Sequence, residues 1–281
     1  MKKLLGLWGL LFPAFFWLFV FFLVPLGIIL VYSFVQRGAY GEIKWVFTWD
    51  NYTRSVDPLY LKILGRSFGV ALLTTGLCLV CGYPLAYFIA FAAPKYKNLF
   101  LILLVIPFWT NFLIRTYAWI AILQDQGLLN LSLLGLGIIQ KPLSLLYTIK
   151  AIMLGMVYGY LPFMVLPIYA SIEKLNLSLL EASMDLGANR IKTFLYVTIP
   201  LTTPGIAAGI TLVFVPTLGE FVIPDILGGA KSVLIGNIVT NQFLTARDWP
   251  FGAAITFIIV VFVLIGLGMF FKVNKNGDFL G

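Results

Sequence analysis

The chain has 281 residues, of which 61% are hydrophobic and 11% are charged, and its formal net charge is +8. A water-soluble domain carries about a quarter charged residues, so this composition excludes a soluble fold and predicts an all-α integral membrane protein. The chain contains no histidine, which excludes the histidine-based metal and nucleophile sites of intramembrane enzymes. We therefore expect no enzyme activity, no metal and no cofactor. The positive residues lie between apolar runs, so we expect no nucleic-acid partner.

About six apolar runs are long enough to cross a bilayer as helices, since a crossing needs about 20 such residues. Their approximate bounds are 10–32, 67–92, 98–123, 149–171, 201–223 and 251–271. Prolines within the spans are expected to bend them; these are Pro84, Pro107, Pro162, Pro167, Pro204 and Pro216. We expect one membrane domain over residues 1–281, with its core at about 61–271.

Lysines stand in the short segments beside the spans and predict the orientation of the chain. They are Lys2 and Lys3 before the first span, Lys95 and Lys97 between the second and third, and Lys272 and Lys275 after the sixth. Because positive residues remain on the cytoplasmic side, we expect both termini in the cytoplasm. On the other side, the apolar segment 128–139 is too short to span, so we expect an interfacial helix in contact with lipid.

The longest cytoplasmic connection in this topology covers about 172–200 and contains helix start and stop signals. Ser178 and Glu181 have capping-box spacing, which predicts a helix starting near Leu179. Gly187 is suited to the left-handed position that ends a helix, and a second short helix is expected from Asn189. The two helices would form a bent element with an apolar face, which indicates a docking partner. The leucines of this face are Leu179, Leu180 and Leu186.

This connection resembles the EAA loop of permease subunits of ATP-binding-cassette importers, whose pattern is E-A-A-x3-G-x9-I-x-L-P. Four positions match the pattern, and three hold residues of similar size. The matches are Glu181, Ala182, Gly187 and Pro200, and the replacements are Ser183, Val197 and Ile199. Further runs resemble the spermidine/putrescine permeases: Asp50–Tyr52, Pro107–Asn111, Gly228–Lys231, Ile235–Asn237 and Arg247–Ala254.

The resemblance implies a multi-pass subunit of a bacterial plasma (inner) membrane importer that forms half of a membrane pathway. It implies three kinds of partner: a cytoplasmic ATPase dimer bound to the EAA loop, a second permease, expected as a heterodimer, and an extracytoplasmic substrate-binding protein. The expected substrates are polyamines. Related importers for iron, phosphonate or thiamine share the same loop and stay as alternatives. A secondary transporter is disfavoured, because the sequence shows no internal repeat and few acidic residues within its spans.

Charged residues within or beside the spans are candidates for the pathway, because burying them in a membrane is costly. A polyamine needs carboxylates to replace its water, and aromatic faces hold ammonium groups. The candidate pathway residues are Glu220, Asp225 and Asp248 with Trp109, Tyr117, Trp249 and Arg115. Two alternatives stay open: Arg115 reaches the headgroups or pairs with Glu220, and Asp225 and Asp248 are solvated loop charges.

Overall fold

The computed structural model describes residues 11–13, 15–91, 95–229 and 232–275. Four residues used above, Lys2, Lys3, Ala230 and Lys231, lie outside the described residues. The chain divides into two compact units, one formed by Ile63–Asn237 and the other by Met1–Lys62 with Ile238–Gly281. Each unit is described by itself.

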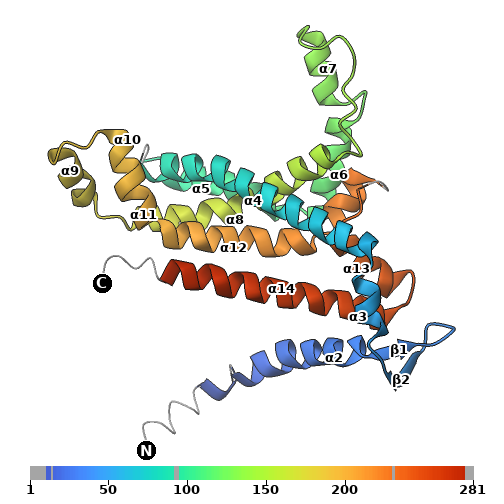
Figure 1. The fold of residues 1–281 in the computed structure, drawn as a ribbon. Coiled ribbons are helices and arrows are strands. Elements are labelled where there is room, and N and C mark those ends of the chain that lie inside the picture. The colour runs from blue at the N-terminus through green and yellow to red at the C-terminus, as the bar shows by residue number, and fades with distance from the viewer. Residues whose placement is uncertain (1–10, 14, 92–94, 230–231, 276–281) are drawn as a thin grey trace, which may run out of the picture. The chain divides into compact units, whose positions relative to one another are not determined.

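The unit Ile63–Asn237 is helical throughout, apart from its connections (Figure 1). Its long helices are α4 (Pro58–Phe91, which begins in the other unit), α8 (Ile149–Glu173) and α12 (Thr203–Gly219). The shorter ones are α5 (Lys97–Val105), η2 (Ile106–Trp109), α6 (Phe112–Leu123), α7 (Leu128–Gly135), α9 (Leu177–Asp185), α10 (Arg190–Thr193), η3 (Phe194–Thr198), α11 (Ile199–Leu201) and η4 (Pro224–Gly228). Helix α13 (Ile235–Leu244) crosses the boundary between the units.

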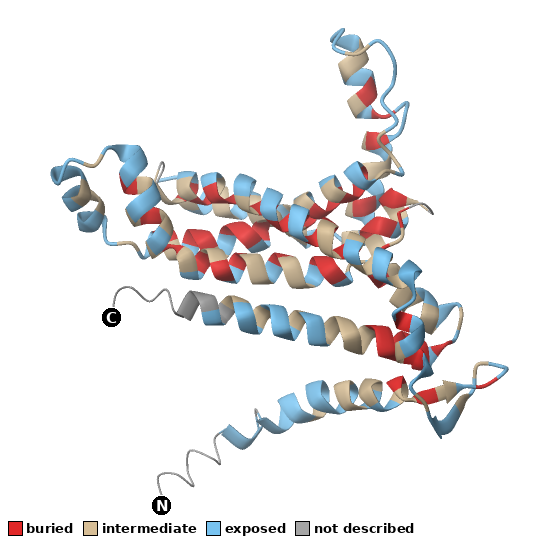
Figure 2. Ribbon diagram, in the orientation of Figure 1, coloured by how far each residue is buried: buried red, intermediate tan, exposed pale blue. Residues whose placement is uncertain are grey.

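The core of this unit lies where α4, α8 and α12 run alongside one another, and their facing residues are buried (Figures 1 and 2). Small residues bring α8 and α12 close together. A Cβ at Gly205 would lie 2.6 Å from the Pro167 carbonyl oxygen, and one at Gly209 would lie 2.7 Å from the Met164 sulfur. Such close approach of helix backbones is typical of packing inside membranes. Helices α9 and α10 lie at one end of this bundle and α7 at the opposite end (Figure 1).

Four helices are long and apolar enough to cross a membrane, namely Leu11–Ser33, Pro58–Phe91, Ile149–Glu173 and Trp249–Phe270. Two bent helix pairs qualify as broken spans: Lys97–Trp109 with Phe112–Gly135, bent by 93°, and Arg190–Leu201 with Thr203–Gly219, bent by 65°. The described chain therefore holds up to six spans, as predicted. The continuous helix expected over 98–123 is wrong, because the chain breaks at Thr110 and Asn111. The second span also starts nine residues earlier than expected, at Pro58.

Proline positions explain only part of this bending. Pro84, Pro162, Pro167 and Pro216 all lie inside helices that continue through them. The two recorded bends instead follow Pro107 and precede Pro204, at the ends of helices. These four prolines therefore do not break their helices, because neighbouring helices can compensate for the missing donor of a proline.

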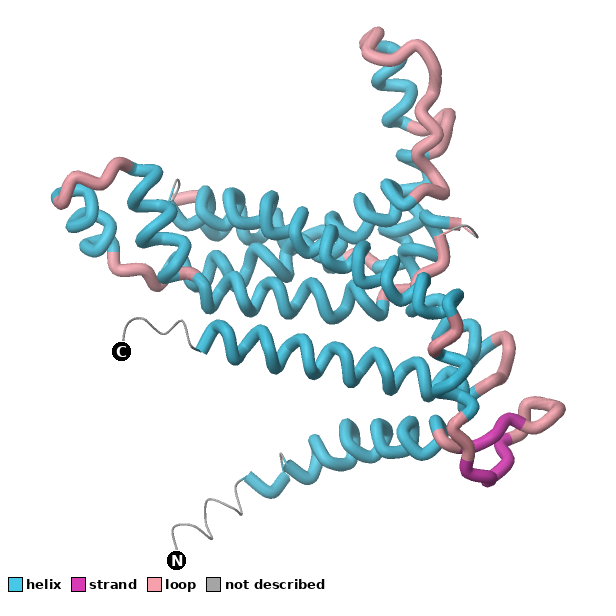
Figure 3. Tube along the Cα trace, in the orientation of Figure 1, coloured by secondary structure: helices cyan, strands magenta, loops and turns pink. Residues whose placement is uncertain are grey.

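The other unit contains the remaining elements, which are η1 (Phe19–Leu23), α2 (Val24–Ser33), β1 (Val35–Arg37), β2 (Ile43–Phe47), α3 (Asp50–Ser55) and α14 (Trp249–Lys275). Strands β1 and β2 pair antiparallel and are the strands of the described chain (Figure 3). Their hairpin was not predicted. It forms because β2 is rich in β-branched and aromatic residues, which favour extended backbone.

Candidate functional site

The element predicted as a docking loop consists of α9, a turn at Gly187, and α10. Asn176 caps α9, since its side-chain oxygen accepts from the Ser178 amide at 3.1 Å. Asn189 caps α10 in the same way, with the Lys192 amide at 2.8 Å. The second helix is therefore confirmed at its expected start. The capping-box expectation for Ser178 is wrong, because Asn176 takes the cap two residues earlier.

Gly187 forms the turn between the two helices. Its φ is +88°, which is the left-handed region, and no atom lies within 4 Å of the place that a Cβ would occupy. The Ala188 amide donates to the Ser183 carbonyl at 3.1 Å and the Gly187 amide to the Met184 carbonyl at 2.9 Å. This pair of bonds is a Schellman motif, which ends a helix with a fixed change of direction. The prediction for Gly187 is confirmed, and its constraint is backbone conformation rather than space.

A hydrogen bond braces the two short helices against each other. The hydroxyls of Ser183 and Thr193 are 2.7 Å apart. Thr193 is buried, whereas Glu181 and Ala182 are exposed. The residue that replaces the third small residue of the family pattern therefore gains a polar contact within the element. The brace makes the bent element more rigid.

Apolar side chains are exposed on this element beside its charged ones. Leu186 is 90% exposed, and Leu179 and Ile191 are exposed with it, while Leu180 is partly buried. Figure 2 shows that α9 and its turn are largely exposed. Apolar side chains presented on a braced, capped element are suited to fit into a groove of a partner protein.

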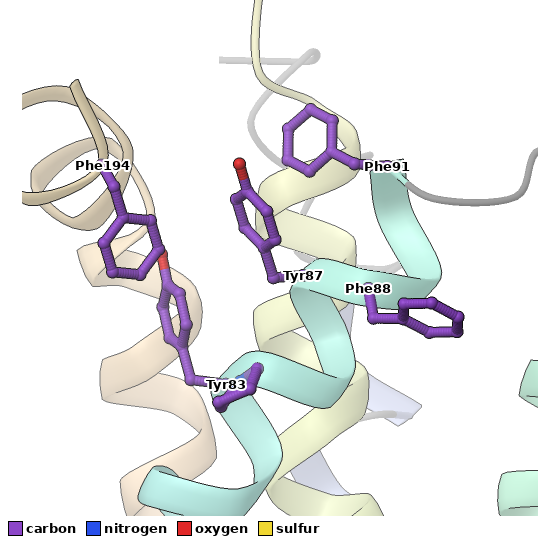
Figure 4. Close-up of a pocket in the computed structure, with 6 residues that line it drawn as sticks. Tyr83, Tyr87, Phe88, Phe91 and Phe194 are labelled. Atoms are coloured by element: carbon purple, nitrogen blue, oxygen red, sulfur yellow. The ribbon is translucent and has the colours of Figure 1, made fainter. Parts of the chain in front are cut away.

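Aromatic rings connect this element to the helix bundle. Phe194, one residue after α10, contacts the rings of Tyr83 and Tyr87 edge-on, each with a centroid distance of 5.6 Å. The Tyr83 hydroxyl lies 2.9 Å from that of Thr202, at the start of α12. These rings line a pocket of about 380 Å³ together with Pro84, Phe88 and Phe91 (Figure 4). The remaining loop residues, Val197, Ile199 and Pro200, continue from Phe194 into α12.

At the opposite end of the bundle, Glu220 occupies the break that follows α12. One carboxylate oxygen accepts from the amides of Phe221 and Val222, at 3.1 and 2.9 Å. The other accepts from the Tyr160 hydroxyl at 2.6 Å. The Glu220 carboxylate therefore caps the helical turn that begins at Val222, and the residue is half-buried. Tyr160 is a partner that the sequence analysis missed.

Asp225 lies a few residues further on and is exposed. Its carboxylate accepts from the Asn237 side-chain amide at 2.6 Å, and the same amide nitrogen donates to the Phe221 carbonyl. Asn237 thus ties together the segment that carries both acids. The sequence analysis did not assign it a role, although Gly236 beside it gave a signal for close packing. A Cβ at Gly236 would lie 2.5 Å from the Gly219 carbonyl oxygen.

Arg115 lies on α6 and belongs to the break in the third span. Its guanidinium donates to the Pro107 carbonyl at 2.9 Å and lies 4.5 Å from the centre of the Phe108 ring. The charge thus satisfies a carbonyl at the end of η2, just before the break. Trp109 and Tyr117 are both exposed near this break.

Asp248 and Trp249 belong to the other unit and start α14. Asp248 is 2% exposed, and its carboxylate lies 3.0 Å from Arg54 and 4.0 Å from Arg37. It also accepts from the Phe251 amide at 3.2 Å and so caps the helix. Both of its oxygens have partners within the chain. Trp249 contacts the rings of Tyr32 and Phe243.

Comparison with known proteins identifies the family. Residues 82–275 match the family described as "Binding-protein-dependent transport system inner membrane component". The chain is similar to the spermidine/putrescine transport system permease protein PotB of Escherichia coli (strain K12), with 47% identity over 92% of this chain and 94% of that protein. PotB of Haemophilus influenzae is 42% identical over 92% of this chain and 91% of its own length.

A solved structure shows the same fold. It is a bacterial ABC transporter involved in the import of the acidic polysaccharide alginate, and one of its chains matches with a TM-score of 0.73 at 17% identity. The match covers 98% of this chain and 96% of that chain. These findings confirm the family that the spacing of Glu181, Ala182, Gly187 and Pro200 predicted. The chain belongs to the family of inner membrane components of binding-protein-dependent transport systems.

Proposed function

We propose that the chain forms one half of the membrane pathway of an ATP-driven importer of polyamines such as spermidine and putrescine. Its sequence contains no nucleotide-binding motif, so a separate cytoplasmic ATPase dimer supplies the energy. The observation that carries this proposal is the braced element α9–Gly187–α10. It presents exposed leucines at one end of the bundle, at the positions of the family's ATPase-binding loop.

The contacts of this element support a route by which motion reaches the bundle. Closure of the ATPases would displace α9 and α10, which move together because Ser183 and Thr193 are hydrogen-bonded. The displacement would pass through the Phe194 ring to Tyr83 and Tyr87 on α4, and through Thr202 to α12. Packed helices switch between discrete arrangements rather than deforming continuously, so this movement would alternate the opening of the pathway.

The substrate follows from the relatives and from the acids at the far end of the bundle. The PotB relatives are named for spermidine and putrescine transport. Asp225 is exposed, and Glu220 lies five residues before it on the segment that Asn237 holds. Carboxylates can replace the water of ammonium groups, and the exposed rings of Trp109 and Tyr117 offer cation–π contacts. For Glu220, binding an ammonium would require exchange of its bond to Tyr160.

The rest of the assembly and the topology complete the proposal. The whole chain, residues 1–281, serves as one permease in the bacterial inner membrane, beside a second permease and with an extracytoplasmic binding protein. We call α9–Gly187–α10 the coupling element and its end of the bundle the coupling end. Both termini and the coupling element face the cytoplasm, and α7 lies at the opposite membrane interface. The position of α9–α10 and α7 at opposite ends of the bundle supports this orientation (Figure 1). Lys97 and Glu173, which pair at 2.7 Å, lie at the coupling end.

The direct test is uptake by the reconstituted complex. The chain is assembled in proteoliposomes with its ATPase, second permease and binding protein, and labelled spermidine uptake is measured. We expect uptake that requires ATP, stops with a non-hydrolysable analogue and is competed by putrescine but not by a phosphonate. Uptake driven by an ion gradient without ATP would contradict the importer assignment. ATP-driven uptake of an anion in place of spermidine would contradict the substrate assignment.

A further inference from the structure

An exposed aromatic surface follows the first membrane span directly. Helix α2 ends at Ser33, and the hairpin begins at Val35. The side chains of Trp45, Phe47 and Trp49 on and beside β2 are 70%, 66% and 60% exposed. We call these three residues the aromatic hairpin surface. Large exposed rings in one place mark a contact with another phase or molecule.

The chain geometry fixes the depth of this surface in a bilayer. The span Leu11–Ser33 has 23 residues, which at 1.5 Å per residue covers about 34 Å. The hydrocarbon layer is about 30 Å thick, so a span that starts with Leu11 at one boundary brings Ser33 close to the other. Phe47 pairs with Val35 in the hairpin. Val35 is two residues after Ser33, so this pair lies only about 7 Å beyond the end of α2. The headgroup layer on each side has roughly that thickness.

Ring contacts join the surface to both spans of this unit. Trp45 contacts Tyr32 in the last turn of α2, and Tyr32 contacts Trp249 at the start of α14, with centroid distances of 6.0 and 6.4 Å. Phe47 stacks on Phe34 at 5.4 Å. The rings therefore form a continuous layer at the level where α2 ends and α14 begins.

Polar contacts hold the hairpin in a fixed position on these helices. The Asn51 side-chain amide donates to the carbonyls of Ser33 and Val35 at 3.0 and 2.9 Å. Arg37, on β1, donates to the Ala246 carbonyl and lies beside the buried Asp248. Since the hairpin is tied to the end of α2 and to the start of α14, the depth of its rings sets the depth of both spans.

The hairpin turn carries a charged side chain, Glu42, together with the 95% exposed Tyr40. The Glu42 carboxylate accepts from the Tyr40 amide at 2.9 Å. The backbone amides of Glu42 itself and of Tyr40 lower the pKa of this carboxyl below its usual value. The turn therefore stays charged at neutral pH and favours water. The charged turn lies further from the end of α2 than the aromatic hairpin surface does. This order matches the increase in polarity from the acyl chains to the headgroups.

We propose that the aromatic hairpin surface is a membrane-interface anchor, with Trp45, Phe47 and Trp49 seated among phospholipid headgroups and the first acyl carbons. Tryptophan is suited to this layer because its ring is apolar and its N–H finds polar partners there. The anchor fixes how deeply α2 and α14 sit in the bilayer. This inference does not depend on the transported substrate or on the ATPase.

Depth-dependent quenching of tryptophan fluorescence tests the anchor. The full chain is reconstituted in phosphatidylcholine–phosphatidylglycerol vesicles whose acyl chains are brominated either near the carbonyl or near the methyl end. Variants retain only Trp45, only Trp49 or only Trp17, with all other tryptophans changed to Phe. Trp17 is the matched control, because it is 62% exposed and lies within the first span. We expect Trp45 and Trp49 to be quenched most by the shallow bromines, and Trp17 to respond more to the deeper ones.

The same experiment can overturn the proposal. If Trp45 and Trp49 show no bromolipid quenching and are quenched freely by aqueous acrylamide, the hairpin extends into water and the anchor is wrong. If lipid has no effect but the binding protein or second permease shields them, the surface is a protein interface and the anchor is equally wrong. Should the multiple Trp→Phe variants fail to fold, the difference in quenching between wild type and W45F/W49F gives the same answer with two changes only.

Discussion

The two ends of the unit Ile63–Asn237 close their helices in different ways. At the coupling end, neutral side chains and a glycine turn cap α9 and α10, and the leucines stay free on the surface. At the opposite end, Glu220 caps the break after α12, while Arg115 bonds to a carbonyl at the end of η2. The caps of α9 and α10 thus contain no charge, whereas the break after α12 is capped by a carboxylate; the Lys97–Glu173 ion pair lies outside these caps.

This difference predicts how substitutions will behave at each end. At the coupling end, function depends on backbone conformation and surface shape, so a change there should affect transport without lowering abundance. At the far end, Glu220 and Arg115 each have a structural partner, so removing either side chain should affect folding as well as transport. Substitutions that keep the hydrogen bonds but remove the charge separate the two roles.

Replacing Gly187 by valine is expected to have the largest effect. A side chain in left-handed backbone costs roughly 1–2 kcal/mol, and more when it is β-branched. We expect spermidine uptake to fall at least about tenfold, because about 1.4 kcal/mol corresponds to a factor of ten in an equilibrium. Uptake and membrane abundance should be measured together.

Gly137 provides the matched control. It has a φ of +70° and open space around its missing side chain, and it lies at the α7 end of the bundle. Gly137→Val introduces the same kind of backbone strain away from the coupling element and should retain most of the uptake. Equal loss of uptake in both variants would show that general strain, and not the coupling turn, is responsible.

Substitutions of Glu220 are expected to have an intermediate effect. Glu220→Gln keeps an oxygen for the capping amides but removes the charge, so abundance should stay normal while spermidine uptake falls about tenfold. Glu220→Ala also removes the cap, which costs about 1–2 kcal/mol, so thermal stability and abundance should fall too. Quantitative blotting, unfolding temperature and uptake distinguish the two variants.

Adding Arg115→Met to Glu220→Gln tests the alternative of a structural ion pair. Because Arg115 donates to the Pro107 carbonyl, and its contacts in the described chain are aromatic rings, we expect no rescue. Restored uptake in the double variant would contradict this arrangement and indicate that the two charges compensate each other.

The smallest expected effect is at the brace between α9 and α10. Ser183→Ala or Thr193→Val should each destabilise the element by about 1 kcal/mol, the usual net value of one hydrogen bond. The double variant should cost less than the sum of the two single ones, because both remove the Ser183–Thr193 bond, while Ser183→Ala also removes the bond to the Leu180 carbonyl. Chemical unfolding of the four proteins measures this coupling. Strictly additive losses would mean that the two hydroxyls act independently.

Local signals in the sequence predicted the coupling element well. Gly187 acts through its own backbone conformation, and the Asn189 side chain bonds an amide only three residues away, so both predictions rested on local geometry and were confirmed. The start of α9 was missed because Ser178 and Asn176 both look like caps from sequence. Asn176 takes the position, and Ser178 instead donates its hydroxyl to the Asn176 side chain at 2.8 Å.

Features that depend on distant residues could not be predicted. Hydropathy finds a span by averaging over about 20 residues, and so it does not show a break such as Thr110–Asn111. The position of Arg115 depends on that break, because its acceptor is the carbonyl of Pro107. Asp248 meets Arg54 across 194 residues of sequence, and Glu220 meets Tyr160 across 60. Such pairings follow from the packing of helices and not from local patterns.

The central claim is that the α9–Gly187–α10 element binds the ATPase, and site-specific cross-linking tests it most directly. Leu186→Cys is made in a chain whose two cysteines, Cys78 and Cys81, are changed to Ala. Leu136→Cys, on the 73% exposed residue that follows α7 at the other end of the bundle, serves as the control. We predict that a thiol cross-linker joins Leu186→Cys to the ATPase in the assembled complex, with a yield that changes when ATP is added, and leaves Leu136→Cys unlinked to it. Absence of any ATPase adduct at Leu186→Cys, or an adduct at Leu136→Cys instead, would contradict the account.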